Sequence, residues 1–146
     1  MKDVTISVRT LQRNEAGEDE TMELETKGIY EENGDVRILR YNETELTGME
    51  GTTTTIEVHP HFISLIRTGK VSQRQEFHPG QTHRAQYNTP FGSITLAMHT
   101  YEMNHRLDAG NGEIHLRYDV ALDGVYTNYN ELTISSREDG HYGYTK

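Results

Sequence analysis

The sequence predicts an all-β protein folded as a single antiparallel up-and-down barrel of about eight to ten strands. Apolar and polar residues alternate with a period of two along most of the chain, the pattern of strands with one buried face. Asn33-Gly34 and Asp123-Gly124 separate such runs and favour two-residue type I′ hairpin turns. No stretch carries a convincing helical period. Because hairpin follows hairpin without a long crossover, an up-and-down barrel is favoured, and its closure removes exposed edge strands.

The N-terminal part of the chain predicts three strands, over residues 4–11, 22–30 and 36–41. Val4, Ile6 and Val8 alternate with polar residues, as expected for a strand with one face in the core. The polar segment 14–19 contains glycine and is typical of a loop. The third strand carries apolar residues on both faces, so we expect it to contact neighbours on both sides.

The middle of the chain predicts four further strands, over residues 52–58, 62–67, 71–77 and 84–89. Pro60 cannot donate a backbone hydrogen bond, so the chain is expected to bend there. Pro79 and Gly80 favour a reverse turn before the last of these strands. Pro90 and Gly92 predict a sharp corner, because one restricts φ and the other has no side chain to clash.

The C-terminal part predicts three strands, over residues 92–101, 113–122 and 126–135. A polar connection rich in turn residues is expected over 104–112. From about residue 136 the chain is polar, so a frayed tail is expected there. The whole chain, residues 1–146, has the size of one domain and is long enough to bury a core.

Composition limits the classes of function. The formal net charge of −9 argues against DNA or RNA as a partner, because phosphate binding needs a surplus of lysine and arginine. The absence of cysteine excludes disulfides, thiolate metal sites and cysteine nucleophiles, and it fits a cytoplasmic location. No apolar run reaches the length of a membrane span, so no membrane association is expected.

No set of residues predicts a catalytic centre. Neighbouring carboxylates lie in polar loops, and the chain has neither a nucleophile elbow nor a glycine-rich phosphate loop, so no cofactor is expected. His59 and His61 are weak candidates for a metal site, because zinc sites use histidines at such spacings. The alternative is that they are dispersed polar residues at strand ends, since this spacing is not diagnostic.

Several polar residues share strand faces with apolar residues. They are Arg40, Arg67, Gln73, Gln75 and Tyr118. Arg40, for example, follows Val36 and Ile38 at even spacing. A buried polar group needs a partner or a ligand, so these side chains are candidates for lining a cavity at the barrel mouth. The alternative is that the arginines and the tyrosine are satisfied by backbone carbonyls at the barrel ends.

Three segments carry a resemblance to a known family. They are FISLIRTG at 62–69, YNTPFG at 87–92 and GEIHLRY at 112–118, with Phe77 between the first two. In this order they resemble the YwiB-type family of small bacterial proteins of unknown function, which is similar to the calycins. The resemblance spans almost the whole chain, and its most specific part is the corner at 87–92 together with Arg67 and Gly69.

The resemblance implies a lipocalin-like, calycin-type barrel, a cytoplasmic location and no established activity. Its recurrent polar positions match Arg67, Gly69, Tyr87, Thr89, Gly92 and Tyr118, none of which has an assigned chemical role. Gln73 and Gln75 depart from the pattern, which leads us to expect apolar residues at these places. Either the register of this strand differs, or this end of the barrel interior is not wholly apolar.

The leading hypothesis is a non-catalytic protein that binds a small amphipathic or anionic ligand in the barrel mouth. The candidate lining residues are Arg40, Arg67, Tyr87, Thr89 and Tyr118. One alternative is a hydrolase or isomerase with a His-centred or metal site. Another is an interaction module that docks a basic partner through its acidic N-terminal face. The protein is expected to be a monomer or a homodimer.

Overall fold

The structure is a computed structural model that describes residues 1–44, 49–70 and 72–139, and the side chain of Thr89 lies outside this description. Ten strands follow one another along these residues. They are β1 (Lys2–Arg13), β2 (Asp19–Asn33), β3 (Val36–Asn42), β4 (Thr52–Val58), β5 (Ile63–Gly69), β6 (Ser72–Phe77), β7 (Thr82–Thr89), β8 (Gly92–Asp108), β9 (Asn111–Leu122) and β10 (Val125–Glu138).

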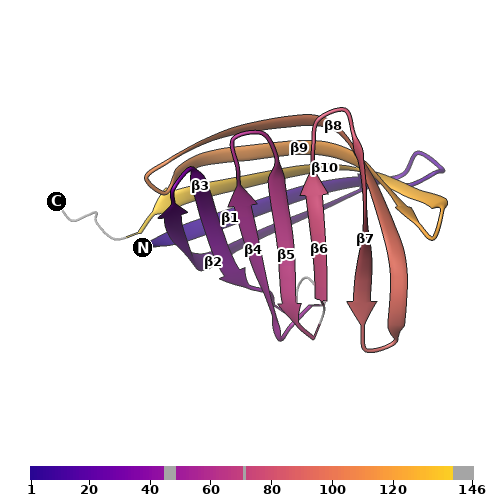
Figure 1. The fold of residues 1–146 in the computed structure, drawn as a ribbon, viewed down its shortest axis with the longest axis horizontal. Helices are drawn as coiled ribbons and strands as arrows, with labels where there is room; N and C mark the ends of the chain where they lie inside the picture. The colour runs from indigo at the N-terminus through magenta and orange to yellow at the C-terminus, as the bar shows by residue number, and fades with distance from the viewer. Residues whose placement is uncertain (45–48, 71, 140–146) are drawn as a thin grey trace.

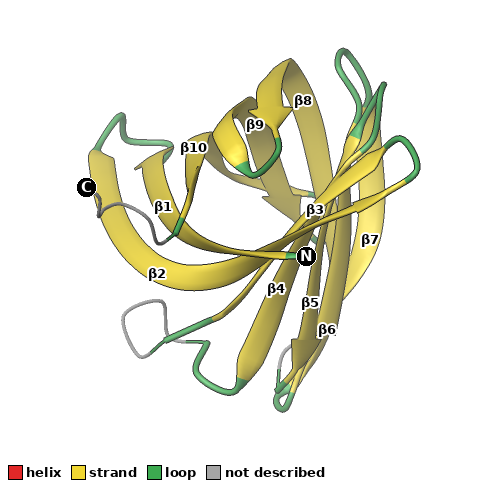
Figure 2. Ribbon diagram, turned by 90° about the vertical axis from the view of Figure 1, so that its left-hand side faces the viewer, coloured by secondary structure: helices red, strands yellow, loops and turns green. Residues whose placement is uncertain are grey.

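The strands form one closed antiparallel barrel (Figure 2). Each strand pairs with the next along the chain, and β1 pairs with β10 to close the ring. This confirms the predicted all-β, up-and-down barrel. In the part of the chain that the structure describes, no helix is long and apolar enough to span a membrane.

Long and short strands divide the barrel into two parts. The strands β1, β2, β8, β9 and β10 have 12 to 17 residues, whereas β3 to β7 have 6 to 8. Figure 1 shows that β1, β9, β10 and the later part of β8 run along the long axis of the molecule, while β3 to β7 lie across it.

The strand β8 is longer than the sequence predicts, because most of the expected connection over 104–112 continues it. A register shift between Thr100 and Glu102 marks a bulge in its pairing with β9. Before the bulge even-numbered side chains such as Met98 are buried, and after it an odd-numbered one, Leu107, is buried. A bulge inserts one extra residue and so reverses the alternation. Because the alternation of buried and exposed residues is reversed after the bulge, the sequence of the second half of β8 resembles that of a polar loop.

The C-terminal strand also extends past the predicted start of the polar tail at about residue 136. Ser136 is buried, and its hydroxyl donates a hydrogen bond to the carbonyl of Gly110 at 2.7 Å. Val4 of β1 pairs with Glu138. Backbone pairing and the Ser136 hydrogen bond therefore keep this polar segment in the sheet.

Both predicted two-residue hairpins exist, but only one has the predicted turn. Asp123 and Gly124 have φ values of 50° and 85°, as a type I′ turn requires. In the other hairpin the turn residues are Gly34 and Asp35, because Asn33 remains in the β2–β3 ladder. Of these two only Gly34 has a positive φ, 62°, which is the pattern of a type II′ turn.

The barrel interior is packed at one end and hollow at the other. The closed end, which carries the β2–β3, β4–β5, β6–β7 and β8–β9 connections, is filled by apolar side chains. Among them are Ile6, Leu39, Ile56, Phe77 and Ile114, each at most 1% exposed. The open end carries the β1–β2, β3–β4, β5–β6, β7–β8 and β9–β10 connections. The cavity described below lies at this open end.

Side chains link β6 and β7 where backbone pairing is sparse. These strands share only two residue pairs in the described ladder, whereas β5 and β6 share five. The Nε2 atoms of His78 and His83 lie 3.0 Å and 3.8 Å from Oε1 of Glu76. Hydrogen bonding with His78 is the main cause that lowers the pKa of Glu76, and Arg74 acts in the same direction against the opposing effect of burial.

The Glu76 carboxylate is expected to stabilise the fold near neutral pH and not in acid. A carboxyl group whose pKa is lower in the folded state contributes stability above its ordinary value of 4.5 and loses it as the pH falls. In thermal unfolding between about pH 7 and about pH 3, Glu76→Gln should therefore lower the Tm most at the higher pH. Glu20→Gln, at an exposed position of β2, controls for loss of a charge. An equal Tm difference at both ends of this range would contradict the prediction.

Candidate functional site

An interior cavity of about 480 Å³ opens at the open end of the barrel. Its walls differ in chemistry. Apolar side chains come mainly from the long strands, and include Val8, Leu24, Leu96, Leu122, Leu132 and Ile134. Polar side chains line both parts of the barrel. On the short-strand side they form a polar wall of Tyr41, Glu43, Arg67, Gln73, Gln75 and Tyr87, whereas on the long strands Thr10, Gln12, Thr127, Asn128 and Asn130 lie among the apolar residues. Tyr118 of β9 also lines the cavity. The cavity is therefore amphipathic.

Three of the predicted site residues meet in this cavity. Arg67, Tyr87 and Tyr118 all line it, from β5, β7 and β9 respectively. The rings of Tyr118 and Phe77 meet edge to face at a centroid distance of 4.8 Å. Because Phe77 belongs to the apolar core, Tyr118 lies where the cavity borders that core. Thr89 lies in β7. Its side chain falls outside the described residues, so its candidate role stays a prediction.

Arg40 does not line the cavity, and the prediction that it faces the interior was wrong. The inward face of β3 is formed by Leu39 and Tyr41, which are 0% and 6% exposed. Arg40 lies between them on the outer face, where its Nη1 donates to Glu31 at 2.7 Å. Because β3 carries apolar residues on both faces, the sequence alone did not distinguish the buried face.

A buried ion pair lies within the polar wall. The Nε atom of Arg67 is 3.9 Å from Oε2 of Glu43, and the two side chains are 19% and 2% exposed. Thr54 donates its hydroxyl hydrogen to the same Oε2 atom. Arg67 also donates from Nη1 to Oε1 of Gln73 at 3.3 Å. The Arg67 guanidinium thus interacts with interior side chains. The alternative interpretation of the sequence expected backbone carbonyls at the barrel end as its partners.

The ion pair leaves two polar atoms unsatisfied. Among the described residues, Oε1 of Glu43 and Nε of Arg67 are buried without a hydrogen-bond partner. Burial is the main cause that raises the pKa of Tyr41, and the negative charge on Glu43 adds to it. Burial likewise raises the pKa of Tyr118, against a smaller opposite effect of Arg67. Both phenols therefore stay neutral at physiological pH and can donate hydrogen bonds.

Glu43 was missed at the sequence level because it follows the predicted end of its strand. It continues the inward series of Leu39 and Tyr41 at a spacing of two residues, and this parity was the available signal. Gln73 and Gln75 were recognised from parity, and they are 6% and 8% exposed on the inner face of β6. Val71, at the start of that series, lies outside the described residues.

The two histidines proposed as weak metal ligands lie at the closed end, away from the cavity. His59 stacks on Phe62 at 4.2 Å, and its Nε2 is 3.3 Å from Glu57. His61 is exposed. Within residues 1–44, 49–70 and 72–139, no group of three or more histidine, cysteine, aspartate or glutamate side chains is placed to hold a metal ion. Nothing in this arrangement favours the metal-site hypothesis.

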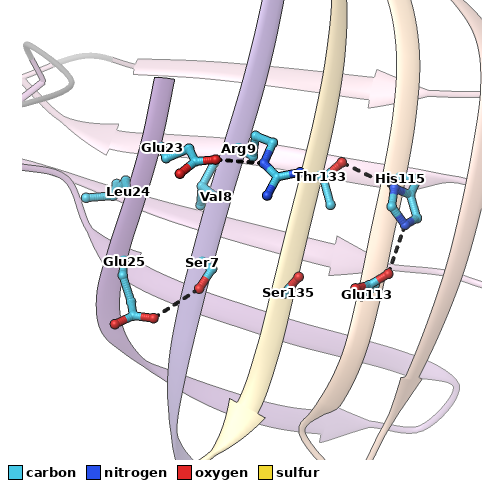
Figure 3. Close-up of a pocket in the computed structure, with 10 residues that line it drawn as sticks. All are labelled: Ser7, Val8, Arg9, Glu23, Leu24, Glu25, Glu113, His115, Thr133 and Ser135. Atoms are coloured by element: carbon cyan, nitrogen blue, oxygen red, sulfur yellow. Dashed lines mark hydrogen bonds and ion pairs between the residues drawn. The ribbon is translucent and has the colours of Figure 1, made fainter. Parts of the chain in front are cut away.

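A second hollow, of about 540 Å³, lies on the outer face of β1, β2, β9 and β10 (Figure 3). Several of its polar groups are already paired with one another. Arg9 bonds Glu23 at 2.9 Å, and His115 lies 3.0 Å from Glu113. Both members of the Arg9–Glu23 pair are 69% exposed. Such exposed pairs are solvated and already satisfied, so the interior cavity is the stronger candidate site.

Comparison with known proteins supports the fold and the family. The uncharacterised β-barrel protein YwiB of Bacillus subtilis (strain 168) is 25% identical over 139 residues, which cover 94% of this chain and 95% of that protein. The crystal structure of the ywiB protein from Bacillus subtilis superposes with a TM-score of 0.86 at 24% identity, over 95% of this chain and 93% of that one.

The family model described as a domain of unknown function (DUF1934) matches residues 6–134. This match covers nearly the whole barrel, from Ile6 in β1 to Ile134 in β10. The resemblance predicted from the segments around Arg67, Tyr87 and Tyr118 is therefore confirmed. The chain belongs to the DUF1934 family.

Proposed function

We propose that the protein binds an amphipathic small molecule in the interior cavity at the open end. The observation that carries this proposal is that the cavity combines a polar wall from the short strands with a long-strand wall that holds most of its apolar side chains. A ligand with an apolar body and a polar head can satisfy both walls at once. Its body would pack against Leu96 and Leu132, and its head would face Arg67, Gln73 and Gln75.

The dimensions and chemistry of the cavity support this proposal. A volume of about 480 Å³ lies within the range of roughly 300 to 1,000 Å³ that is usual for small-molecule sites. Barrels of this kind can enclose one small ligand. Buried polar groups without partners are costly, and a ligand that pairs with the polar wall would offset that cost.

Fluorescence titration with the uncharged dye N-phenyl-naphthylamine tests the proposal. Wild-type protein should enhance the dye emission in a saturable way. Thr10→Trp should weaken binding at least about tenfold, because Thr10 lines the cavity from β1 and the indole would occupy it. The matched control is Arg9→Trp, since Arg9 is the preceding residue and its side chain is 69% exposed on the outer face.

The control variant should bind the dye like the wild type. Equal affinity of all three proteins would show that the dye binds elsewhere, and absence of saturable binding to the wild type would also contradict the proposal. Thermal unfolding of each variant verifies that the barrel is intact.

No specific observation favours the other functional hypotheses. The His-centred or metal enzyme and the interaction module that uses the acidic N-terminal face remain predictions from the sequence. The same holds for the calycin-type relationship, the cytoplasmic location and the choice between monomer and homodimer. The proposed ligand binding does not depend on any of these predictions.

A further inference from the structure

We infer that Glu43 makes the cavity selective for a ligand with an uncharged polar head and against a carboxylate. This inference rests on the proposed function, because it concerns the ligand of the same cavity. It differs from what the arginine alone suggests, since a single Arg67 in a barrel mouth would favour an anion. The structure places a buried carboxylate beside that arginine.

The charges in the cavity sum to zero. Among the described residues that line it, Glu43 and Arg67 are the charged ones, and they lie 3.9 Å apart. Glu43 is held in place by the Thr54 hydroxyl, which donates to it. The positive charge of Arg67 is therefore already compensated from within the protein.

A ligand carboxylate would be disfavoured in this position. To reach Arg67 it must approach the Glu43 carboxylate as well, because the pair is so close. It would also lose its hydration in a partly enclosed space, where repulsion between like charges is screened less than in water. Both effects act against the anion and leave an uncharged head unaffected.

The other polar side chains of the cavity suit an uncharged head that both donates and accepts hydrogen bonds. Gln73, Gln75 and Asn130 are buried carboxamides, and each carries an NH₂ donor and a carbonyl acceptor. Tyr41 and Tyr118 add neutral phenols. A primary or secondary amide is a head of matching chemistry. We therefore assign the ligand to the class of uncharged amphipathic molecules with an amide-like head.

Octanamide and octanoate are isosteric probes that differ in this head charge. Their dissociation constants at neutral pH can be measured by displacement of N-phenyl-naphthylamine and by isothermal titration calorimetry. The wild type should bind octanamide at least about tenfold more tightly than octanoate. Glu43→Gln leaves Arg67 uncompensated, so octanoate affinity should rise at least about tenfold while octanamide affinity changes little.

A matched control exists on the outside of the same barrel. Glu31 pairs with Arg40 at 2.7 Å on the outer face, so Glu31→Gln removes a carboxylate from an equivalent ion pair outside the cavity. Its octanamide-to-octanoate ratio should equal that of the wild type. Replacing both Glu43 and Arg67 with glutamine should restore the preference for octanamide.

The outcomes separate this inference from the proposed function. If N-phenyl-naphthylamine does not bind in the cavity, the proposed function fails. If the dye binds but the wild type takes octanoate as tightly as octanamide, or Glu43→Gln leaves the ratio unchanged, only the charge selectivity is overturned. The wild-type ratio decides the matter even where a variant does not fold.

Discussion

Gly112→Ala is expected to lower the free energy of unfolding by about 4 kcal/mol. Gly112 has a φ of +142°, a conformation that side-chain-bearing residues rarely adopt. A Cβ atom there would lie 1.8 Å from the carbonyl oxygen of Arg106. That oxygen belongs to the backbone of β8 and cannot move without disrupting the β8–β9 ladder. Thermal unfolding should show a loss of roughly 10 °C in Tm.

The matched control for this prediction is Gly34→Ala. Gly34 also has a positive φ, +62°, but a Cβ atom there would meet nothing within 4 Å. Only the conformational strain remains at this turn, and it costs about 1 kcal/mol. Equal losses for the two variants would show that the approach of Arg106 to Gly112 is not as close as described.

Arg67→Met is expected to destabilise the protein by about 3 kcal/mol. The variant removes the cation that faces Glu43 and leaves a carboxylate that is 2% exposed without a charged partner. It also removes the hydrogen bond to Gln73. Breaking a buried ion pair costs about 3 to 5 kcal/mol. Because Arg67 is 19% exposed, water can partly solvate the carboxylate that is left behind, and we expect the lower end of this range. Chemical unfolding with a common m-value measures the difference.

Two comparisons identify burial as the cause. Arg40→Met breaks the outer Arg40–Glu31 pair, whose members are 40% and 33% exposed, and should cost less than about 1 kcal/mol. Combining Arg67→Met with Glu43→Leu removes both buried charges and should recover most of the lost stability. If Arg40→Met costs as much as Arg67→Met, or the double variant is no more stable than Arg67→Met alone, the explanation is wrong.

The local sequence pattern was sufficient to predict turns and buried faces where neighbouring residues determine the backbone geometry. Asp123-Gly124 predicted its turn, because a type I′ turn depends on the φ preferences of these two residues. Alternation in β9 predicted that Ile114 and Leu116 are buried. Arg67, Tyr87 and Tyr118 were likewise found on cavity-lining positions. For the strand residues, the period of two determined which way the side chain points.

Pattern failed where alternation was interrupted or ambiguous. The bulge after Thr100 reversed the phase of β8, so its second half read as a polar connection. In β3 both faces are apolar in sequence, and only packing against the other strands shows that Arg40 points outward. Neither outcome is local, because each depends on which neighbour a strand pairs with.

The sequence by itself determined the β class and the succession of hairpins, because these depend on short-range periodicity and turn chemistry, and its resemblance to a known family rested on three short motifs. The tertiary structure decided that the barrel is packed at one end and hollow at the other, and that Glu43 meets Arg67 in the hollow end. These two residues are far apart in the chain and come together through the register of β3, β4 and β5. That register depends on the connections between these strands and on which faces are buried together, and the propensity of single residues does not encode it.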